Sequence, residues 1–313
     1  MRLLRAFAVL TFLPAALLAQ RPVAAPTPVP VGRFDLGKMW TFEYAPSEYF
    51  SSTYGFTADS AWFTRARLAA LRIPGCSAAF VSNDGLIITN HHCVRGSLNG
   101  ISRKGENILD SGYVAATPAD ERRIPGMFAD QLLAAVDVSD EVNTAGDAVA
   151  EGPARDEARK TASAAVQSRL KAKYATPGDS VWVQVVALYN GARSSAYVFR
   201  RYTDIRLVVA AEIGVANLGG DWDNFTFPRY ALDFAVMRAY GADGKPMPSP
   251  HHFAWGGVDG VKNGDVVFVI GNPGATRRLT TVSQLEYQRD VALPLDEQFL
   301  ASHMAALKAF RET

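Results

Sequence analysis

The chain has 313 residues, of which 48% are hydrophobic and 20% are charged, and its formal net charge is +1. This size and composition are typical of a soluble globular protein with one large or two medium domains. A nearly neutral chain without a basic stripe argues against a nucleic-acid partner. No later apolar run reaches the length of a membrane-spanning helix, so we expect no association with the membrane.

The N-terminus has the features of a secretory signal peptide. Arg2 and Arg5 form a short basic region, residues 6–18 are apolar, and a small residue follows. We therefore expect residues 1–19 to be removed on export. Residues 20–34 are rich in Pro, Ala and Val and should form an extended lead-in. The mature protein is expected to be periplasmic or secreted.

Residues 76–93, CSAAFVSNDGLIITNHHC, have the pattern of a β-hairpin. Two apolar runs, residues 77–81 and 86–89, flank Asn-Asp-Gly, which is a strong turn signal. We expect a hairpin whose second strand ends on residues 90–93. This arrangement would hold a histidine rigidly just beyond a strand end, as catalysis requires.

Cys76 and Cys93 are the two cysteines of the chain, one at each end of this hairpin. Two cysteines in an exported protein can pair, and closing a loop of this size would stabilise the fold by roughly 3 kcal/mol. The alternative is a free Cys93 thiol that acts as a nucleophile beside His92. We favour the disulfide because an oxidising compartment would consume the thiol.

The rest of the chain predicts a mainly β fold with helical additions. Apolar residues at helical spacing predict a short helix near residues 58–70 and a surface helix within residues 150–174. From residue 281 the pattern is again helical. Alternating or β-branched runs predict strands at residues 132–138, 180–188, 197–211 and, leading into a Gly-Pro loop, 264–277. A turn at residues 189–191 would join two of them as a hairpin.

Residues 89–93, Thr-Asn-His-His-Cys, resemble the Thr-Ala-Ala-His-Cys motif of chymotrypsin-like serine peptidases. With residues 76–88 ahead of it, the stretch resembles more closely the bacterial dipeptidyl-peptidase 7/11 family of serine exopeptidases, peptidase family S46. Similar segments continue in family order from about residue 35 to the end. The resemblance implies that His92 is the general base of an enzyme that releases dipeptides from free N-termini.

The resemblance also implies a fold: a chymotrypsin-like double β-barrel with a helical domain inserted between the barrels. Residues 35–279 would hold mostly the first barrel, and residues 280–313 would begin the helical domain. In the family the serine nucleophile follows that domain, in a Gly-Asn-Ser-Gly-Ser-like segment that nothing here matches. We therefore expect the nucleophile outside this chain, and residues 1–313 alone to be inactive.

Ser180 is an alternative nucleophile, because Gly178-Asp179-Ser180 is similar to the Gly-Asp-Ser motif of chymotrypsin-like peptidases. A strand-like segment follows it, without the glycines that let backbone N–H groups form an oxyanion hole. We interpret Ser180 as a turn residue at the start of a strand.

Asp233 is the acid that we expect to orient His92. It precedes an apolar strand and resembles the Asp-Ile-Ala-Leu-Leu segment of chymotrypsin-like peptidases, whose Asp holds the catalytic His. Such a carboxylate is costly to bury unless it is paired, and an imidazole base needs a partner for its developing charge. Asp221 and Asp223 compete for this role, but they lie in a Gly-rich loop where Asp commonly bonds its own backbone.

Residues 219–230 resemble the family segment Gly-Gly-Asp-Thr-Asp-Asn-Trp-Met-Trp-Pro-Arg-His, which helps to hold the free N-terminus of the substrate. By position, Asn224 and Phe225 take this role. An amide oxygen accepts from an ammonium group, and an aromatic face attracts a cation. Phe225 replaces the family's Trp and is a weaker cation partner, while Trp222 stands nearby to compensate.

No cofactor or metal is expected. The doublet His251-His252 has no third ligand at metal-site spacing, so we interpret both as surface histidines. The expected partner is a peptide substrate, and the family resemblance allows a homodimer of the full-length protein. Two alternatives stay open: a trypsin-like endopeptidase without the ammonium subsite, and a secreted β-barrel binding protein with a degenerate site.

Overall fold

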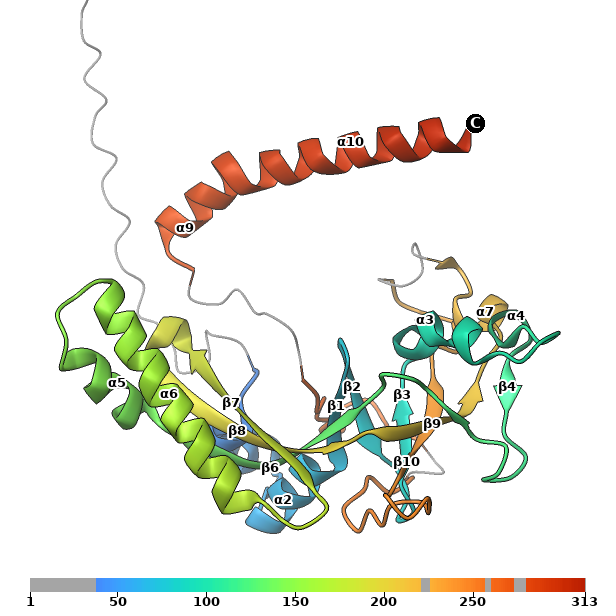
Figure 1. Cartoon of the computed structure of the whole chain (residues 1–313), viewed down its shortest axis with the longest axis horizontal. Helices are drawn as coiled ribbons and strands as arrows, with labels where there is room; N and C mark the ends of the chain where they lie inside the picture. The colour runs from blue at the N-terminus through green and yellow to red at the C-terminus, as the bar shows by residue number, and fades with distance from the viewer. Residues whose placement is uncertain (1–37, 221–225, 257–259, 273–279, 313) are drawn as a thin grey trace, which may run out of the picture. The chain divides into compact units, whose positions relative to one another are not determined.

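The structure is a computed structural model that describes residues 38–220, 226–256, 260–272 and 280–312. The helices and strands below lie between Phe42 and Arg311 and are labelled in Figure 1 where there is room. None of the described helices combines the length and apolar character needed to cross a bilayer. The predicted domain boundaries, 1–19, 20–34, 35–279 and 280–313, stay predictions.

Ten strands of the described residues form one sheet in the order β4-β9-β10-β3-β2-β1-β6-β8-β7, and β5 pairs with β9 (Figure 1). Neighbouring strands run antiparallel. The strands are β1 (Ala70–Ile73), β2 (Cys76–Phe80), β3 (Leu86–Thr89), β4 (Tyr113–Val114), β5 (Arg122–Arg123), β6 (Ala129–Asp137), β7 (Ser180–Leu188), β8 (Arg193–Tyr202), β9 (Asp204–Ala210) and β10 (Ala235–Tyr240). The predicted class, mainly β with helical additions, is confirmed.

The described helices precede, connect and follow the strands along the chain. They are η1 (Phe42–Tyr44), α1 (Ser47–Tyr54), α2 (Ser60–Ala69), α3 (His91–Ile101), α4 (Ile108–Ser111), α5 (Ser139–Asp147), α6 (Pro153–Tyr174), η2 (Tyr189–Gly191), α7 (Ile213–Ala216), α9 (Val282–Tyr287), the π-helix η3 (Gln288–Ala292) and α10 (Leu293–Arg311). The helices expected near residues 58–70, within 150–174 and from 281 are confirmed as α2, α6 and α9–α10.

Two hydrophobic clusters stabilise the sheet. The first lies among β1, β2, β3, β9, β10 and α3 and contains Leu71, Phe80, Ile87, Leu207 and Met237, all at most 1% exposed. The second lies between the α5–α6 pair and the β7–β8 hairpin (Figure 1) and contains Val142, Val166, Leu170, Val181 and Val198. The first cluster therefore supports the segment that carries His92, and the second supports the β7–β8 hairpin.

The β2–β3 hairpin confirms the expected turn at Asn83-Asp84-Gly85. Ala79 pairs with Ile88, and Phe80 pairs with Ile87. Gly85 has a φ of +82°, and a Cβ there would lie 2.9 Å from the Ala239 carbonyl oxygen. Glycine is required at this position because any other side chain would be strained and would clash with β10.

Residues 197–211 do not form the single predicted strand. The chain breaks at Thr203 into β8, which pairs with β6 and β7, and β9, which pairs with β10, β4 and β5. The break is where the chain leaves one part of the sheet and enters another. Tyr202 and Ile205 are both buried although they are three residues apart, so the alternation changes phase at the break. The composition is strand-like on both sides, and composition alone does not reveal the break.

The strand predicted from residue 264 is also not formed: residues 265–270 belong to no strand, and residues 273–277 lie outside the described residues. Val267 and Val269 are exposed, while Phe268 packs against Phe50 and Trp62. A strand needs a neighbour for its backbone hydrogen bonds, and no described segment pairs with this one. Apolar, β-branched composition alone does not supply that neighbour.

Candidate active site

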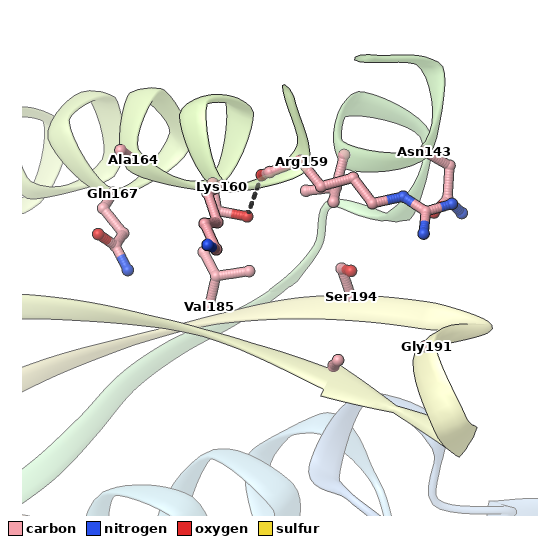
Figure 2. A pocket seen from close by; sticks show the side chains of 11 residues that line it. Asn143, Arg159, Lys160, Ala164, Gln167, Val185, Gly191 and Ser194 are labelled. Atoms are coloured by element: carbon pink, nitrogen blue, oxygen red, sulfur yellow. Dashed lines mark hydrogen bonds between the residues drawn. The ribbon is translucent and has the colours of Figure 1, made fainter. Parts of the chain in front are cut away.

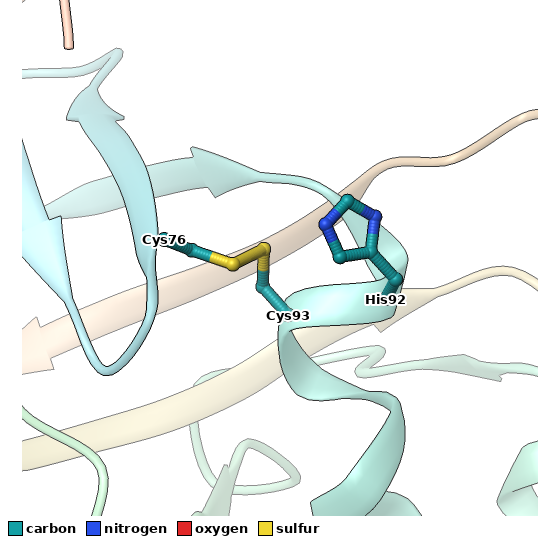
Figure 3. A group of neighbouring side chains, drawn as sticks. All are labelled: Cys76, His92 and Cys93. Carbon is teal, nitrogen blue, oxygen red and sulfur yellow. A yellow bond between two sulfur atoms is a disulfide. The ribbon is translucent and has the colours of Figure 1, made fainter. Parts of the chain in front are cut away.

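The disulfide Cys76–Cys93 joins the start of β2 to the first turn of α3 (Figure 3), with 6.2 Å between the two Cα atoms. The predicted pairing is therefore confirmed, and a free Cys93 thiol is excluded. The second strand of the hairpin ends at Thr89, so the prediction that it runs through residues 90–93 is wrong. Asn90 has extended backbone at the N-cap of α3, and Asn is among the residues that favour a helix start.

His92 and Asp233 face one another. The His92 Nδ1 atom lies 2.8 Å from Asp233 Oδ2, and the His92 backbone N–H donates to Asp233 Oδ1 at 3.0 Å. The two side chains differ in exposure: 7% for Asp233 and 53% for His92. The ring is thus anchored on one side by a buried carboxylate and open to solvent on the other, as a general base requires.

The Asp233 carboxylate caps the N-terminus of α3 in place of the Asn90 side chain. An N-cap Asn normally accepts a hydrogen bond from the first turn of its helix, but Asn90 makes no such bond. The Asp233 carboxylate accepts from the first-turn amide of His92 instead. A helix N-terminus stabilises a negative charge, so α3 favours the ionised carboxylate.

The pKa of the Asp233 carboxyl reflects two opposing effects. Burial alone would raise the pKa, because it disfavours the charged form. Hydrogen bonds from the His92 amide and ring, the charge of His92 and a hydrogen bond from Arg229 lower it, and they prevail. The pKa of Asp233 therefore lies below its ordinary value, and the group is an anion at neutral pH.

His91 has a different environment. It is 1% exposed, and burial lowers the pKa of its imidazole, so the ring is neutral in the interior. We predicted that His92 rather than His91 faces Asp233, and this is confirmed. Both histidines lie on α3, where successive side chains point about 100° apart, so only one of them faces Asp233.

Two residues of the site were not predicted, Asn90 and Arg229. Asn90 Nδ2 donates to the Asp233 carbonyl oxygen at 2.9 Å, and Arg229 Nη2 donates to Asp233 Oδ2 at 3.0 Å. The spacing of Arg229, four residues before Asp233, gave no usable signal, because the pairing of opposite charges at this spacing applies to helices and residues 229–234 are not helical. Nothing in the sequence indicates that the Asn90 amide faces Asp233.

The other predicted residues are placed as follows. Asn224 and Phe225, and the competing acids Asp221 and Asp223, lie outside the described residues. Ser180 begins β7, and four strands (β2, β1, β6 and β8) lie between β7 and β3 in the sheet. This position agrees with the interpretation of Ser180 as a residue at the start of a strand.

One group of side chains within the described residues has the composition of a metal site: Cys76, His92 and Cys93, whose ligand atoms lie within 4.8 Å of one another (Figure 3). The two sulfur atoms are bonded to each other and offer no thiolate to a metal.

The doublet His251-His252 is half-buried rather than on the surface, and His252 Nδ1 lies 2.9 Å from the Ser249 carbonyl oxygen.

A separate cavity of about 440 Å³ lies between the α5–α6 pair and the β7–β8 hairpin (Figure 2). Arg159 and Lys160 of α6 line it, and ion pairs with Asp147 and Glu157 partly satisfy their charges. Neither His92 nor Asp233 lines this cavity, so it is distinct from the candidate active site.

Comparison with known proteins identifies the family of the chain. The family model of Peptidase S46 matches residues 34–313. A dipeptidyl-peptidase 7 of Porphyromonas endodontalis is 32% identical over 217 residues, which cover 66% of this chain and 26% of that protein. An Asp/Glu-specific dipeptidyl-peptidase of Shewanella putrefaciens is 33% identical over 230 residues, which cover 70% of this chain and 30% of that protein.

Solved structures give the same fold. The crystal structure of Porphyromonas endodontalis DPP11 in complex with the dipeptide Arg-Glu has a TM-score of 0.61 and 24% identity, over 73% of this chain and 36% of that chain. This chain therefore spans roughly a quarter to a third of the length of these proteins. Since the family model covers nearly the whole sequence, the chain belongs to the peptidase S46 family.

Proposed function

We propose that this chain supplies the general base and the orienting acid of a serine dipeptidyl-peptidase. The observation that carries the proposal is the 2.8 Å contact between Nδ1 of the exposed His92 ring and the buried Asp233 carboxylate, in a chain of the peptidase S46 family. The relatives named as dipeptidyl-peptidases add support.

The chemistry follows from this geometry. With Nδ1–H donated to Asp233, the ring has a free lone pair on Nε2, which removes the proton from a serine hydroxyl as the oxygen attacks the peptide carbonyl. Asp233 stabilises the imidazolium that forms. The ring then returns the proton to the leaving amine, and the acyl-enzyme is hydrolysed by the same steps with water. We assign the serine and the oxyanion donors to a segment outside residues 1–313.

Substrate selection is assigned to the loop before Asp233. Asn224 is proposed to accept from the substrate's N-terminal ammonium group, and Phe225 to offer its aromatic face to that cation. Because such a subsite would lie at a fixed distance from the nucleophile, cleavage would occur after the second residue of the substrate. Because Phe is a weaker cation partner than Trp, Trp222 is proposed to contribute.

The proposal extends to architecture and location. The antiparallel sheet with its disulfide-bonded hairpin supports the first barrel of a chymotrypsin-like double barrel, with α9–α10 opening an inserted helical domain. The signal-like residues 1–19 support export to the periplasm or the medium, and the complete protein is proposed to act on peptides, as a monomer or a homodimer. N-terminal sequencing of the exported protein would test removal of residues 1–19.

The test is the release of a chromophore from dipeptidyl substrates with a free or an acetylated N-terminus, by the complete protein. We expect turnover of the free substrate and little of the acetylated one. Asn224→Ala should reduce turnover of the free substrate selectively, while the matched variant Asn217→Ala in the neighbouring turn should not. Equal turnover of both substrates would indicate an endopeptidase. Activity of the 313-residue chain that is lost in Ser180→Ala would contradict the assignment of the nucleophile.

A further inference from the structure

We infer that Arg229 is a positioning residue of this site: it fixes the Asp233 carboxylate in the orientation that faces His92 and keeps that carboxylate ionised. The inference rests on the proposed function, since the ring that Asp233 orients is the proposed base. Arg229 acts through Asp233, because it donates a hydrogen bond to the carboxylate.

The contacts of the carboxylate carry the argument. Asp233 Oδ2 lies 2.8 Å from Nδ1 of the His92 ring, and it accepts a hydrogen bond from Nη2 of Arg229 at 3.0 Å. Asp233 Oδ1 accepts a hydrogen bond from the His92 backbone N–H at 3.0 Å. A carboxylate oxygen has two acceptor positions, so Oδ2 accommodates both donors at once. These three contacts together fix the direction in which the Asp233 carboxylate points.

Burial separates this pair from an ordinary surface ion pair. The Asp233 side chain is 7% exposed and the Arg229 side chain is 30% exposed. In a surface ion pair of η3, the side chains of Arg289 and Asp290 are 70% and 55% exposed. Water screens the exposed pair strongly and the buried pair much less. Removal of Arg229 would therefore leave a buried anion with fewer donors, which is costly.

The charges around the pair determine how it should respond to pH. His92 and His91 of α3 and Arg229 of the preceding loop act on Asp233, and Arg95 of α3 acts on His91. Asp221 and Asp223 lie outside the described residues. Without Arg229, protonation of Asp233 would occur at higher pH, because a donor to its charged form is lost. The His92–Asp233 pair as a whole would therefore take up its first proton at higher pH, because a nearby positive charge is lost. This moves the loss of activity on the acid side to higher pH.

Asn90 supports the same orientation from the other side. Its Nδ2 donates to the Asp233 carbonyl oxygen at 2.9 Å and lies 3.4 Å from Oδ2. It therefore fixes the backbone of Asp233, while Arg229 fixes the carboxylate. This division explains why the N-cap residue of α3 makes no capping bond to its own helix.

The test uses Arg229→Met, which removes the charge and the donors, and Arg229→Lys, which keeps the charge without the planar fork. Arg95→Met, an exposed residue on α3, is the matched control for loss of a positive charge near the site. For the complete protein we expect Arg229→Met to lower kcat about tenfold to a hundredfold with KM within about twofold. The acid limb of kcat/KM should move up by about half to one pH unit. Arg229→Lys should lose less, and Arg95→Met should resemble the wild type.

A second readout does not depend on activity. In the 313-residue chain, proton NMR should show a downfield ring N–H resonance of His92 that is shared with Asp233. The resonance should be lost or shifted in Arg229→Met and retained in Arg229→Lys and Arg95→Met. If Arg229→Met fails to fold, Arg229→Gln, which removes the charge and keeps a neutral donor, decides by the same two readouts, and a Gln variant identical to the wild type in both would overturn the proposal. A raised KM with unchanged kcat would also overturn it, because it would indicate substrate binding. If the wild type hydrolyses no dipeptidyl substrate, the proposed function fails, and the resonance still decides the role of Arg229.

Discussion

Two buried carboxylates, Asp233 and Asp130, both accept hydrogen bonds from arginine and differ in their other partners. Asp130 lies on β6 with its side chain 0% exposed, and it accepts from Arg201 at 2.7 and 2.9 Å, from Trp182 Nε1 at 3.1 Å and from Arg72 at 3.3 Å. Asp233 is also nearly buried and accepts from an arginine, but its closest partner is the His92 ring, which is 53% exposed. The two sites thus differ mainly in one partner.

That difference separates a structural site from a site able to transfer protons. Arginine and tryptophan keep their protons at any physiological pH, so the Asp130 network has one charge state. Stacking reinforces it, because Arg201 lies 3.7 Å from the Phe128 ring centroid and Arg72 lies 4.3 Å from that of Phe199. An imidazole gains and loses a proton near neutral pH, and the exposed ring of His92 can exchange it with a substrate. A buried carboxylate alone therefore does not identify an active site.

The largest effect is expected from Asp233→Asn. The amide preserves the shape but favours the wrong His92 tautomer, so kcat of the complete protein should fall by about 10⁴, as for the corresponding change in a chymotrypsin-type triad. The melting temperature should change little, because most of the packing remains. Steady-state kinetics and circular dichroism would measure both quantities. A kcat within tenfold of the wild type would show that Asp233 is not the orienting acid.

Asp130→Asn should show the opposite pattern. Two arginines would lose their buried counter-charge, so the free energy of unfolding should fall by about 3–5 kcal/mol. The kcat of the folded fraction should stay within a few-fold of the wild type. Urea unfolding measures the first quantity, and Glu141→Gln, which removes an exposed partner of Arg169, is the control with an expected loss under about 1 kcal/mol. Equal losses in the two variants would remove the distinction between buried and exposed pairs.

Replacing both Cys76 and Cys93 by Ser should destabilise the fold by about 3 kcal/mol, the value expected for a loop closed over a sequence separation of 17. Because the bridge holds the first turn of α3, activity should also fall, while the Asp130 network should be unaffected. Hydrogen exchange would show this as faster exchange in α3 than in β6 and β8. Equal acceleration in both regions would contradict a local role.

The smallest effect concerns acid stability. The pKa of Asp233 is lowered in the folded state, so its contribution to stability is full above its unfolded pKa of about 4 and is lost as pH falls through the folded pKa. The difference in unfolding free energy between wild type and Asp233→Asn should therefore narrow below about pH 4. Urea unfolding at pH 6 and pH 3 would measure this difference. A difference that widens on acidification would mean that the folded pKa is raised.

Local signals in the sequence predicted much of the fold and the central pair of the site. Asn83-Asp84-Gly85 predicted the β2–β3 hairpin, helical spacing predicted α6, and the acid before β10 predicted the partner of His92. These features depend on residues close together in sequence or on motifs of a known family. Their catalytic roles stay predictions.

The features that sequence could not predict depend on contacts between distant segments. The helical start of α3 relies on an Asp233 carboxylate 141 residues away, and the Asn90 amide turns toward the same group. The break between β8 and β9 depends on which strands they join. Residues 265–270 have strand-like composition, but strand formation also needs a neighbour that composition does not reveal.

The most direct test of the central claim is kcat of His92→Ala in the complete protein, on a dipeptidyl substrate with a free N-terminus. Members of a triad act as a unit, so we expect kcat to fall by several orders of magnitude with a wild-type melting temperature. His91→Ala is the adjacent control: it should lower stability, because it removes a buried side chain, and leave the kcat of the folded fraction largely intact. A His92→Ala variant that keeps more than about a tenth of the wild-type kcat would contradict the assignment of His92 as the general base.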